Sequence, residues 1–162
     1  MVVTQAEGAL VGKLDDFQFD LVTRQIYGYR IKGSGMFSKA GGVAADKLVQ
    51  VGRDVVFVAS EQDIEWNAPA RKSEEGRAWA SQYKGTRAMS RRGTALGQVE
   101  DFVFDAAVDK VLALFLDGDR VLELDDNVAT GPAAVVADSS DLVQELPGTP
   151  SEQQSWWARL RK

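Results

Sequence analysis

The chain has 162 residues, a net charge of −5 and 44% hydrophobic residues, and it contains neither cysteine nor histidine. That length and composition supply the core of one ordinary domain or of two very small ones. The absence of cysteine excludes disulfides, thiolate nucleophiles and zinc–thiolate sites, and the absence of histidine removes the commonest general base and metal ligand. We therefore expect a non-enzymatic protein without a metal or a cofactor.

The first strand is predicted within residues 12–20, GKLDDFQFD. Phe17 and Phe19 alternate with polar residues, which is the period-two pattern of a half-buried strand. Asp20 then ends the strand in a turn, where a short carboxylate can accept backbone N–H bonds. The next strand has three apolar side chains that we predict to share one face, Tyr27, Tyr29 and Ile31.

A glycine-rich loop follows at residues 33–42, GSGMFSKAGG. It departs from a phosphate-binding P-loop, because Ser38 stands where the second glycine of that motif belongs and Ala40 stands where its hydroxyl residue belongs. Glycines flank two apolar residues, Met36 and Phe37. Apolar side chains on such a loop are typical of a contact with a partner protein or with a neighbouring domain, and the sequence leaves both open.

The segment 62–86 changes from strand to helix periodicity. Trp79 and Tyr83 lie four residues apart, and Ser73 is suited to be an N-cap. We predict a short helix over 73–84 that joins the two parts of the chain.

Four cations in the middle of the chain form a candidate basic patch: Lys84, Arg87, Arg91 and Arg92. Residues 93–140 carry ten acidic and two basic side chains, a net charge of −8, and such a surface repels phosphate backbones. A solvated strand edge is the simplest interpretation of the four cations. RNA contact through residues 84–92 is kept as an alternative.

The motif at residues 12–20 occurs a second time at 97–105, GQVEDFVFD. At the offset of 85 residues between the two copies, seven positions are identical: Gly8, Gly12, Asp16, Phe17, Phe19, Asp20 and Gly33 match Gly93, Gly97, Asp101, Phe102, Phe104, Asp105 and Gly118. The later part of each copy matches at an offset of 79, so the first copy has six extra residues (85 − 79), which fall in the glycine-rich loop. Two copies of one sequence unit predict two copies of one fold.

The second copy has a predicted strand at 111–116, VLALFL, that is apolar on both faces and therefore buried on both. We expect the two copies to pack against each other through this strand. Asp117 and Gly118 follow between two hydrophobic runs, which is a strong hairpin signal.

Carboxylates are frequent from this hairpin onward, in the series Asp117, Asp119, Glu123, Asp125 and Asp126. The series lacks the ligand spacing of a calcium-binding loop, and turn chemistry accounts for its members. Two further pairs recur at equivalent positions of the copies, Asp16 with Asp20 and Asp101 with Asp105. Their recurrence favours a shared structural turn over general acid–base catalysis.

The C-terminal segment is predicted to form a helix, with Thr149 as N-cap and Pro150 at the first helical position. Its apolar side chains are Trp156, Trp157 and Leu160. Three alternatives remain for this apolar face: docking on the rest of the chain, contact with a second copy or a partner's groove, and peripheral contact with a membrane surface.

Each copy places about five short strands in some 50 residues, which suits a small closed or half-closed barrel. The motif G-x-(V/L)-x-D-(F/x)-x-(F/V)-D, the hydrophobic strand after it and the closing run GRDVVFV at 52–58 resemble the PRC-barrel family. The likeness covers about residues 10–61 and 94–138. That family includes the cytoplasmic domain of the photosynthetic reaction-centre H subunit and the C-terminal domain of a bacterial ribosomal RNA processing factor. The resemblance implies a six-stranded small β-barrel that serves as a protein-docking platform.

We therefore predict a mainly β protein with two tandem PRC-type β-barrels, a short connecting helix and a C-terminal helix. The first barrel spans residues 1–61, the linker 62–86, the second barrel 87–140 and the C-terminal tail 141–162. A cytoplasmic location is expected, because the apolar runs are far shorter than a membrane span and the N-terminus lacks the pattern of a signal peptide.

The predicted function is that of an adaptor or scaffold that binds another protein, whose identity the sequence does not give, or a second copy of this chain. The candidate contact residues are Met36, Phe37, Trp156, Trp157 and Leu160. One alternative is an RNA-associated or ribosome-maturation role through residues 84–92. Another, suggested by the H subunit, is an accessory role in a membrane or electron-transfer complex.

Overall fold

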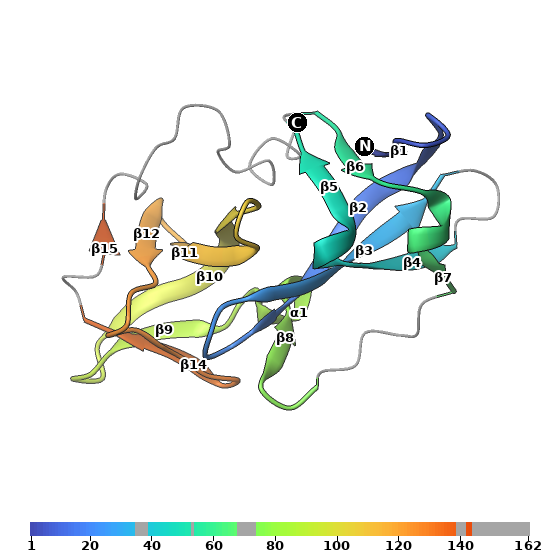
Figure 1. Cartoon of the computed structure of the whole chain (residues 1–162). Coiled ribbons are helices and arrows are strands. Elements are labelled where there is room, and N and C mark those ends of the chain that lie inside the picture. Colours follow the sequence, from blue (N-terminus) through green and yellow to red (C-terminus); the bar gives the residue numbers. More distant parts are fainter. Residues whose placement is uncertain (35–38, 53, 68–73, 139–141, 144–162) are drawn as a thin grey trace.

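The computed structural model describes residues 1–34, 39–52, 54–67, 74–138 and 142–143. This described part is mainly β, as predicted, and its strands form two sheets that lie side by side, with β8 (Arg77–Trp79) and α1 (Ala80–Tyr83) between them (Figure 1). None of the helices in the described part is long and apolar enough to cross a bilayer.

The first sheet contains β8 and seven strands from the first copy of the repeat, which we call the first half. These seven are β1 (Val2–Thr4), β2 (Leu10–Asp20), β3 (Ile26–Gly33), β4 (Ala40–Ala44), β5 (Leu48–Val51), β6 (Val56–Val58) and β7 (Glu65–Trp66). Their order is β5-β6-β1-β2-β3-β4-β7, and β8 pairs with β2. Two short 3₁₀-helices, η1 (Ala45–Lys47) and η2 (Glu61–Asp63), precede β5 and β7.

The second sheet contains seven strands from the second copy, which we call the second half. They are β9 (Arg87–Ser90), β10 (Ala95–Asp105), β11 (Lys110–Leu116), β12 (Arg120–Glu123), β13 (Ala129–Thr130), β14 (Ala134–Ala137) and β15 (Leu142–Val143). Their order, β13-β14-β9-β10-β11-β12-β15, matches that of the first half strand for strand. Each half also has one parallel pair at the same place, β1 with β6 and β9 with β14. The sequence repeat is therefore a repeat of topology.

Two predictions about the second half are confirmed. In β11, Val111, Ala113 and Leu114 are all buried although they lie on both faces of the strand. The hairpin predicted at Asp117 and Gly118 joins β11 to β12, and Gly118 takes the positive φ of +72° that favours glycine in such a turn.

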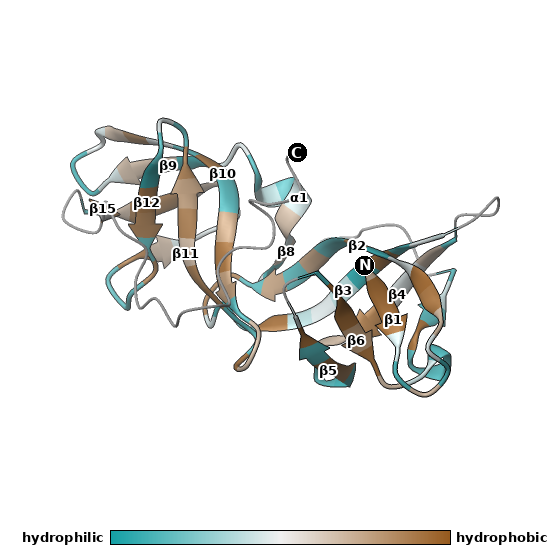
Figure 2. Cartoon of the chain, turned by 90° about the horizontal axis from the view of Figure 1, so that it is seen from above, coloured by the Kyte–Doolittle hydropathy of each residue, from teal (hydrophilic) through white to brown (hydrophobic). Residues whose placement is uncertain are grey.

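One continuous hydrophobic core runs through both halves, and apolar stretches are visible in strands of both sheets (Figure 2). The prediction that the halves pack through residues 111–116 covers only part of the joint, because most of the aromatic contacts between the halves come from β2 and β10. The Phe17 ring lies 5.4 Å from that of Phe102 and 5.5 Å from that of Phe104, and the Phe19 ring lies 5.6 Å from that of Phe102. Register shifts occur just before Phe19 and Phe104 at equivalent points of the two halves, where β3 and β11 each carry one extra residue, and such bulges bend the strand that carries the extra residue.

The β2–β3 and β10–β11 turns meet, so that equivalent residues of the two halves contact each other. Gln25 forms a bridge with Lys110, which is its own counterpart at the offset of 85. Val111 N donates to Arg24 O at 3.0 Å. In the equivalent bond, Ile26 N donates to the carbonyl oxygen of Asp109, the counterpart of Arg24, at 2.6 Å. These reciprocal bonds indicate an approximate two-fold relation between the halves.

The linker helix predicted over 73–84 is wrong over most of its length. Residue 73 lies outside the described residues, Gly76 has a φ of +77° that breaks helical geometry, and only Ala80–Tyr83 is α-helical. The intervening residues form β8, because the edge of β2 offers them backbone partners that an isolated segment lacks. A tertiary contact has overridden the local helical pattern.

Candidate binding groove

A groove of about 610 Å³ lies on the outer face of the first sheet. It crosses β3 and β4, with β8 on one side and residues 62–65 on the other. Its lining includes Tyr27, Gly28, Gly42, Lys47, Arg77 and Trp79. In the following text this feature is called the groove.

Tyr27 and Arg77 form one wall of the groove. The Arg77 guanidinium carbon lies 3.7 Å from the centroid of the Tyr27 ring, in the geometry of a cation–π contact. Arg77 also forms an ion pair with Glu74 at 2.7 Å, which holds the guanidinium over the ring. The Tyr27 side chain is 41% exposed. The Tyr27 ring is thus an ordered aromatic surface that is accessible to solvent.

The floor and the opposite wall of the groove differ in character from this aromatic wall. Gly28 and Gly42 leave backbone atoms of β3 and β4 at the floor. On the opposite side, Lys47 and Asp63 form an ion pair at 3.8 Å, and Glu65 adds a second carboxylate. The groove therefore has a floor without side chains at Gly28 and Gly42 and carries charges of both signs.

The sequence prediction that Tyr27, Tyr29 and Ile31 share one face is wrong for Tyr27. Tyr29 and Ile31 are buried, but Tyr27 is the extra residue of a β-bulge, because the pairing of β3 with β2 passes from Gly28 directly to Ile26. A bulge of this kind turns a side chain to the other face. The sequence held one signal of it, since Ile26 is also apolar and two adjacent residues cannot both face inward on a regular strand.

Tyr29, beneath the groove, links the first half to the second. Burial raises the pKa of Tyr29 well above its usual value, so the phenol stays protonated and donates to Asp109 Oδ1 at 3.2 Å. Asp109 is the counterpart of Arg24 at the offset of 85, and it takes a positive φ of +48°. The floor of the groove is thereby fixed to the joint between the halves.

We predict that Asp109→Asn stabilises the protein at neutral pH. Burial, together with the nearby carboxylates Asp46 and Asp105, raises the pKa of Asp109, while the bond from Tyr29 lowers it in part. Because the folded-state pKa lies above the unfolded value, ionisation of Asp109 costs stability as the pH rises through these two values. Asn keeps the acceptor for Tyr29 and tolerates a positive φ.

Denaturant unfolding over a range of pH checks this prediction. The variant should be more stable than the original chain at pH 7, and the difference should vanish below about pH 3.9, the value for an unfolded Asp. Asp54→Asn removes the same charge at an exposed position and serves as the control. If the stability difference between Asp109→Asn and the original chain were the same at all pH values, ionisation of Asp109 would not be its cause.

Among the described residues, the equivalent face of the second half is more apolar than the groove. The counterparts of Gln18 and Gly28 at the offset of 85 are Val103 and Ala113, and the counterpart of Gly42 in β12 is Val121. Val103, Ala113 and Val121 are buried there. The repeat has thus diverged on its outer faces while it kept its topology.

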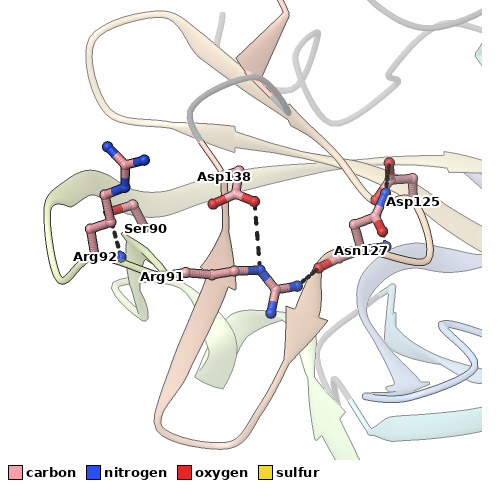
Figure 3. Close-up of polar contacts among 6 residues, drawn as sticks. All are labelled: Ser90, Arg91, Arg92, Asp125, Asn127 and Asp138. Atoms are coloured by element: carbon pink, nitrogen blue, oxygen red, sulfur yellow. Dashed lines mark hydrogen bonds and ion pairs between the residues drawn. The ribbon is translucent and has the colours of Figure 1, made fainter.

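Two of the four cations in the predicted basic patch have acidic partners within the chain. Lys84 forms an ion pair with Asp101 at 3.3 Å. Arg91 donates to the carbonyl oxygen of Asn127 at 2.6 Å and pairs with Asp138 at 3.6 Å, whereas the Arg92 side chain points away from this group (Figure 3).

The four cations are also spread along the second half: Arg87 begins β9, Lys84 follows α1, and the other two lie in the turn after β9. Cations with nearby acidic partners attract a phosphate backbone weakly.

The other candidate contact residues lie outside the described residues. They are Met36 and Phe37 in the loop after β3, and Trp156, Trp157 and Leu160 in the C-terminal segment. The helix predicted from Thr149 lies there too. These positions stay predictions.

The recurring carboxylates serve the fold. Asp16 is buried and accepts bonds from Phe17 N at 2.9 Å and from Ser81 N at 3.0 Å, and the equivalent Asp101 accepts a bond from Phe102 N at 3.1 Å.

At the following turn, bonds from the N–H groups of Thr23 and Val22 lower the pKa of Asp20, and Asp105 accepts a bond from Ala107 N at 2.8 Å. Within the described residues, no group of three or more acidic side chains is arranged to hold a metal ion.

No protein-family model matches this sequence, and no curated protein matches it either. The likeness to the PRC-barrel family therefore rests on the motif that occurs twice in the sequence.

Proposed function

We propose that this chain is a non-enzymatic adaptor or scaffold of the PRC-barrel type, which binds a segment of another protein in the groove of its first half. The observation that carries this proposal is the exposed Tyr27 ring, held by Arg77 above a floor of glycines. Tyrosine and arginine are the residues that most often dominate the energy of protein–protein contacts, because they combine a large apolar area with polar groups.

The remaining chemistry of the groove supports a peptide as its ligand. A peptide segment carries apolar side chains for the aromatic wall, and the lack of side chains at Gly28 and Gly42 lets its backbone approach the face of the sheet closely. The mixed charges of Lys47, Asp63 and Glu65 suit a polar peptide better than a phosphate backbone, which two carboxylates would repel.

The second half supplies the rigid base in this proposal. Its core is continuous with that of the first half, and the Tyr29–Asp109 bond lies beneath the groove. A ligand site on a rigid support loses little conformational entropy on binding. We assign the adaptor to the cytoplasm, in keeping with a chain that has no cysteine.

The groove is tested with peptides selected from a random peptide library against the immobilised full chain. Their binding is then measured by fluorescence anisotropy for the original chain and for Tyr27→Ala. We expect the substitution to weaken binding at least about tenfold, or ~1.4 kcal/mol, because it removes the aromatic wall.

Val22→Ala is the matched control, since Val22 is 79% exposed on the neighbouring turn and does not line the groove. It should bind the selected peptides as the original chain does. The groove is not the binding site if no peptide is selected, or if the selected peptides bind Tyr27→Ala with unchanged affinity.

A further inference from the structure

The charged side chains of the groove form ion pairs that leave one carboxylate over. Lys47 pairs with Asp63 at 3.8 Å, and Arg77 pairs with Glu74 at 2.7 Å. Glu65 also lines the groove, but no cation of the described residues lies within ion-pair distance of its carboxylate. The charged lining residues and their partners therefore carry two positive and three negative charges, a net charge of −1 (2 − 3).

The surroundings of the groove add to this negative charge. Asp46 precedes Lys47 in η1, and Asp109 accepts the hydrogen bond from Tyr29 beneath the floor. Arg30 lies opposite Gly42 on the same face of the sheet but does not line the groove. Two carboxylates and one cation thus contribute one further negative charge. A cleft with an excess of one sign of charge attracts ligands of the opposite sign.

The Glu65 carboxylate stands beside the open floor of the groove. In the pairing of β4 with β7, Glu65 lies opposite Gly42, and directly opposed residues project from the same face of a sheet. Gly42 has no side chain, so β4 places nothing at this position between Glu65 and a ligand on the floor. The Glu65 side chain is exposed, and its charge is accessible to a ligand.

We propose that the groove recognises a peptide with a basic residue, lysine or arginine, whose cation pairs with Glu65 while an apolar residue of the same peptide contacts Tyr27. This inference rests on the proposed function of the groove and adds the charge that its ligand carries. Glu65 is then the residue that determines specificity, because the other charges of the groove already have partners within the chain.

The geometry of the sheet gives the spacing of the two peptide residues. Tyr27 lies next to Gly28 on β3, and Glu65 lies on β7, beyond β4 in the strand order. Two strand spacings are about 10 Å, and the two residue steps along β3 from Gly28 to Arg30, which faces Gly42, are about 7 Å. The two contact sites are therefore ~12 Å apart, or about four residues of an extended peptide.

The charge of the ligand is tested by selecting peptides from a random library on the immobilised full chain and on Glu65→Arg. Peptides selected on the original chain should carry lysine or arginine about four residues from an apolar residue. Those selected on Glu65→Arg should carry aspartate or glutamate at that position and keep the apolar residue, because the charge of the wall is reversed. The same charge at that position in both sets of peptides would overturn the inference.

Glu75→Arg is the matched control for this selection. Glu75 is exposed, precedes β8 and does not line the groove. The substitution changes the net charge of the chain by the same amount as Glu65→Arg. It should select the same basic peptides as the original chain. A switch to acidic peptides on Glu75→Arg would show that the overall charge of the chain, and not Glu65, selects the ligand.

Glu65→Gln measures the ion pair itself. A basic peptide selected on the original chain should bind Glu65→Gln about fivefold more weakly in fluorescence anisotropy at low salt, as expected for a solvent-exposed ion pair. The difference should disappear at about 1 M salt, where charges are screened within ~3 Å. Glu75→Gln should bind as the original chain does. Equal affinities of Glu65→Gln and the original chain at low salt would contradict the inference.

Failure of this inference can be told apart from failure of the proposed function. If Tyr27→Ala weakens binding but Glu65→Gln does not, the groove binds peptides without a preference for basic residues, and only the inference is wrong. If both variants bind the selected peptides with unchanged affinity, the peptides bind elsewhere on the chain, and the inference and the proposed function are both wrong.

Discussion

Replacing Phe102 with Ala is expected to lower the free energy of unfolding by about 4 kcal/mol, the usual cost of removing a fully buried aromatic ring. Phe102 is almost fully buried, and its ring contacts three rings from outside its own half. The centroid distances are 5.4 Å to Phe17, 5.6 Å to Phe19 and 6.3 Å to Tyr83. The cavity left by the substitution would therefore lie in the joint between the halves and cannot be refilled from one side alone.

Guanidinium unfolding followed by far-ultraviolet circular dichroism measures this effect. The original chain should unfold in one transition, because a single core runs through both halves. Val108→Ala is the control, since Val108 is 56% exposed and its loss should cost no more than about 0.5 kcal/mol. Two separate transitions in the original chain would show that the halves are independent and that the aromatic joint is weak.

The β character of each half and the likeness of the two halves could be predicted from the sequence because they depend on local patterns, whereas the parallel pairs β1–β6 and β9–β14 could not. Alternating apolar residues define β2 and β10, and Asp117 with Gly118 defines a hairpin, so the repeat at a constant offset yields two similar sheets. The sequence places six extra residues in the first copy, after β3. In the structure, the connection from β3 to β4 is accordingly longer than that from β11 to β12.

The joint between the halves could not be predicted in the same way. Phe17 and Phe102 have the alternation of ordinary core residues, and nothing local shows that each will contact the other copy. The β-bulges in β3 and β11, which lie opposite Phe19 and Phe104, are a property of strand pairing, which a single strand's sequence does not encode.

The groove could not be predicted from the sequence either, because it too depends on strand pairing. Tyr27 turns outward only because a bulge inserts it beside β2, and Arg77 reaches it only because β8 joins that sheet. Both events require partners that are distant in the sequence. The candidate residues that could be chosen from sequence were apolar or basic side chains near glycines and termini, which carry a visible local signal.

Replacing Arg24 with Ala is expected to lower the free energy of unfolding by about 3 kcal/mol, because bonds from a charged donor to buried acceptors are lost. Arg24 is in the first half, is only 7% exposed and donates to three carbonyl oxygens of the second half. They belong to Leu124, to Asp125 at 2.5 Å and to Val128 at 3.0 Å. The single ammonium group of lysine cannot donate to all three carbonyl oxygens as the planar guanidinium does. Arg24→Lys should therefore recover little of the lost free energy of unfolding.

The backbone of Arg24 provides an internal control for this prediction. Its φ is +65°, a region that glycine adopts without strain, so Arg24→Gly should be about 1 kcal/mol less destabilising than Arg24→Ala. Equal stability of the Ala variant and the original chain would mean that the three carbonyl groups are satisfied without the guanidinium.

The contrast between Arg24 and Asp109 is the sharper test, because the two residues are counterparts in the repeat and both reach into the other half. Removing the charge should destabilise the protein at Arg24, where the cation meets carbonyl oxygens, and stabilise it at Asp109, where the anion lies near Asp46 and Asp105. If both substitutions shifted stability in the same direction, the joint would be held by packing alone and not by these opposite charges.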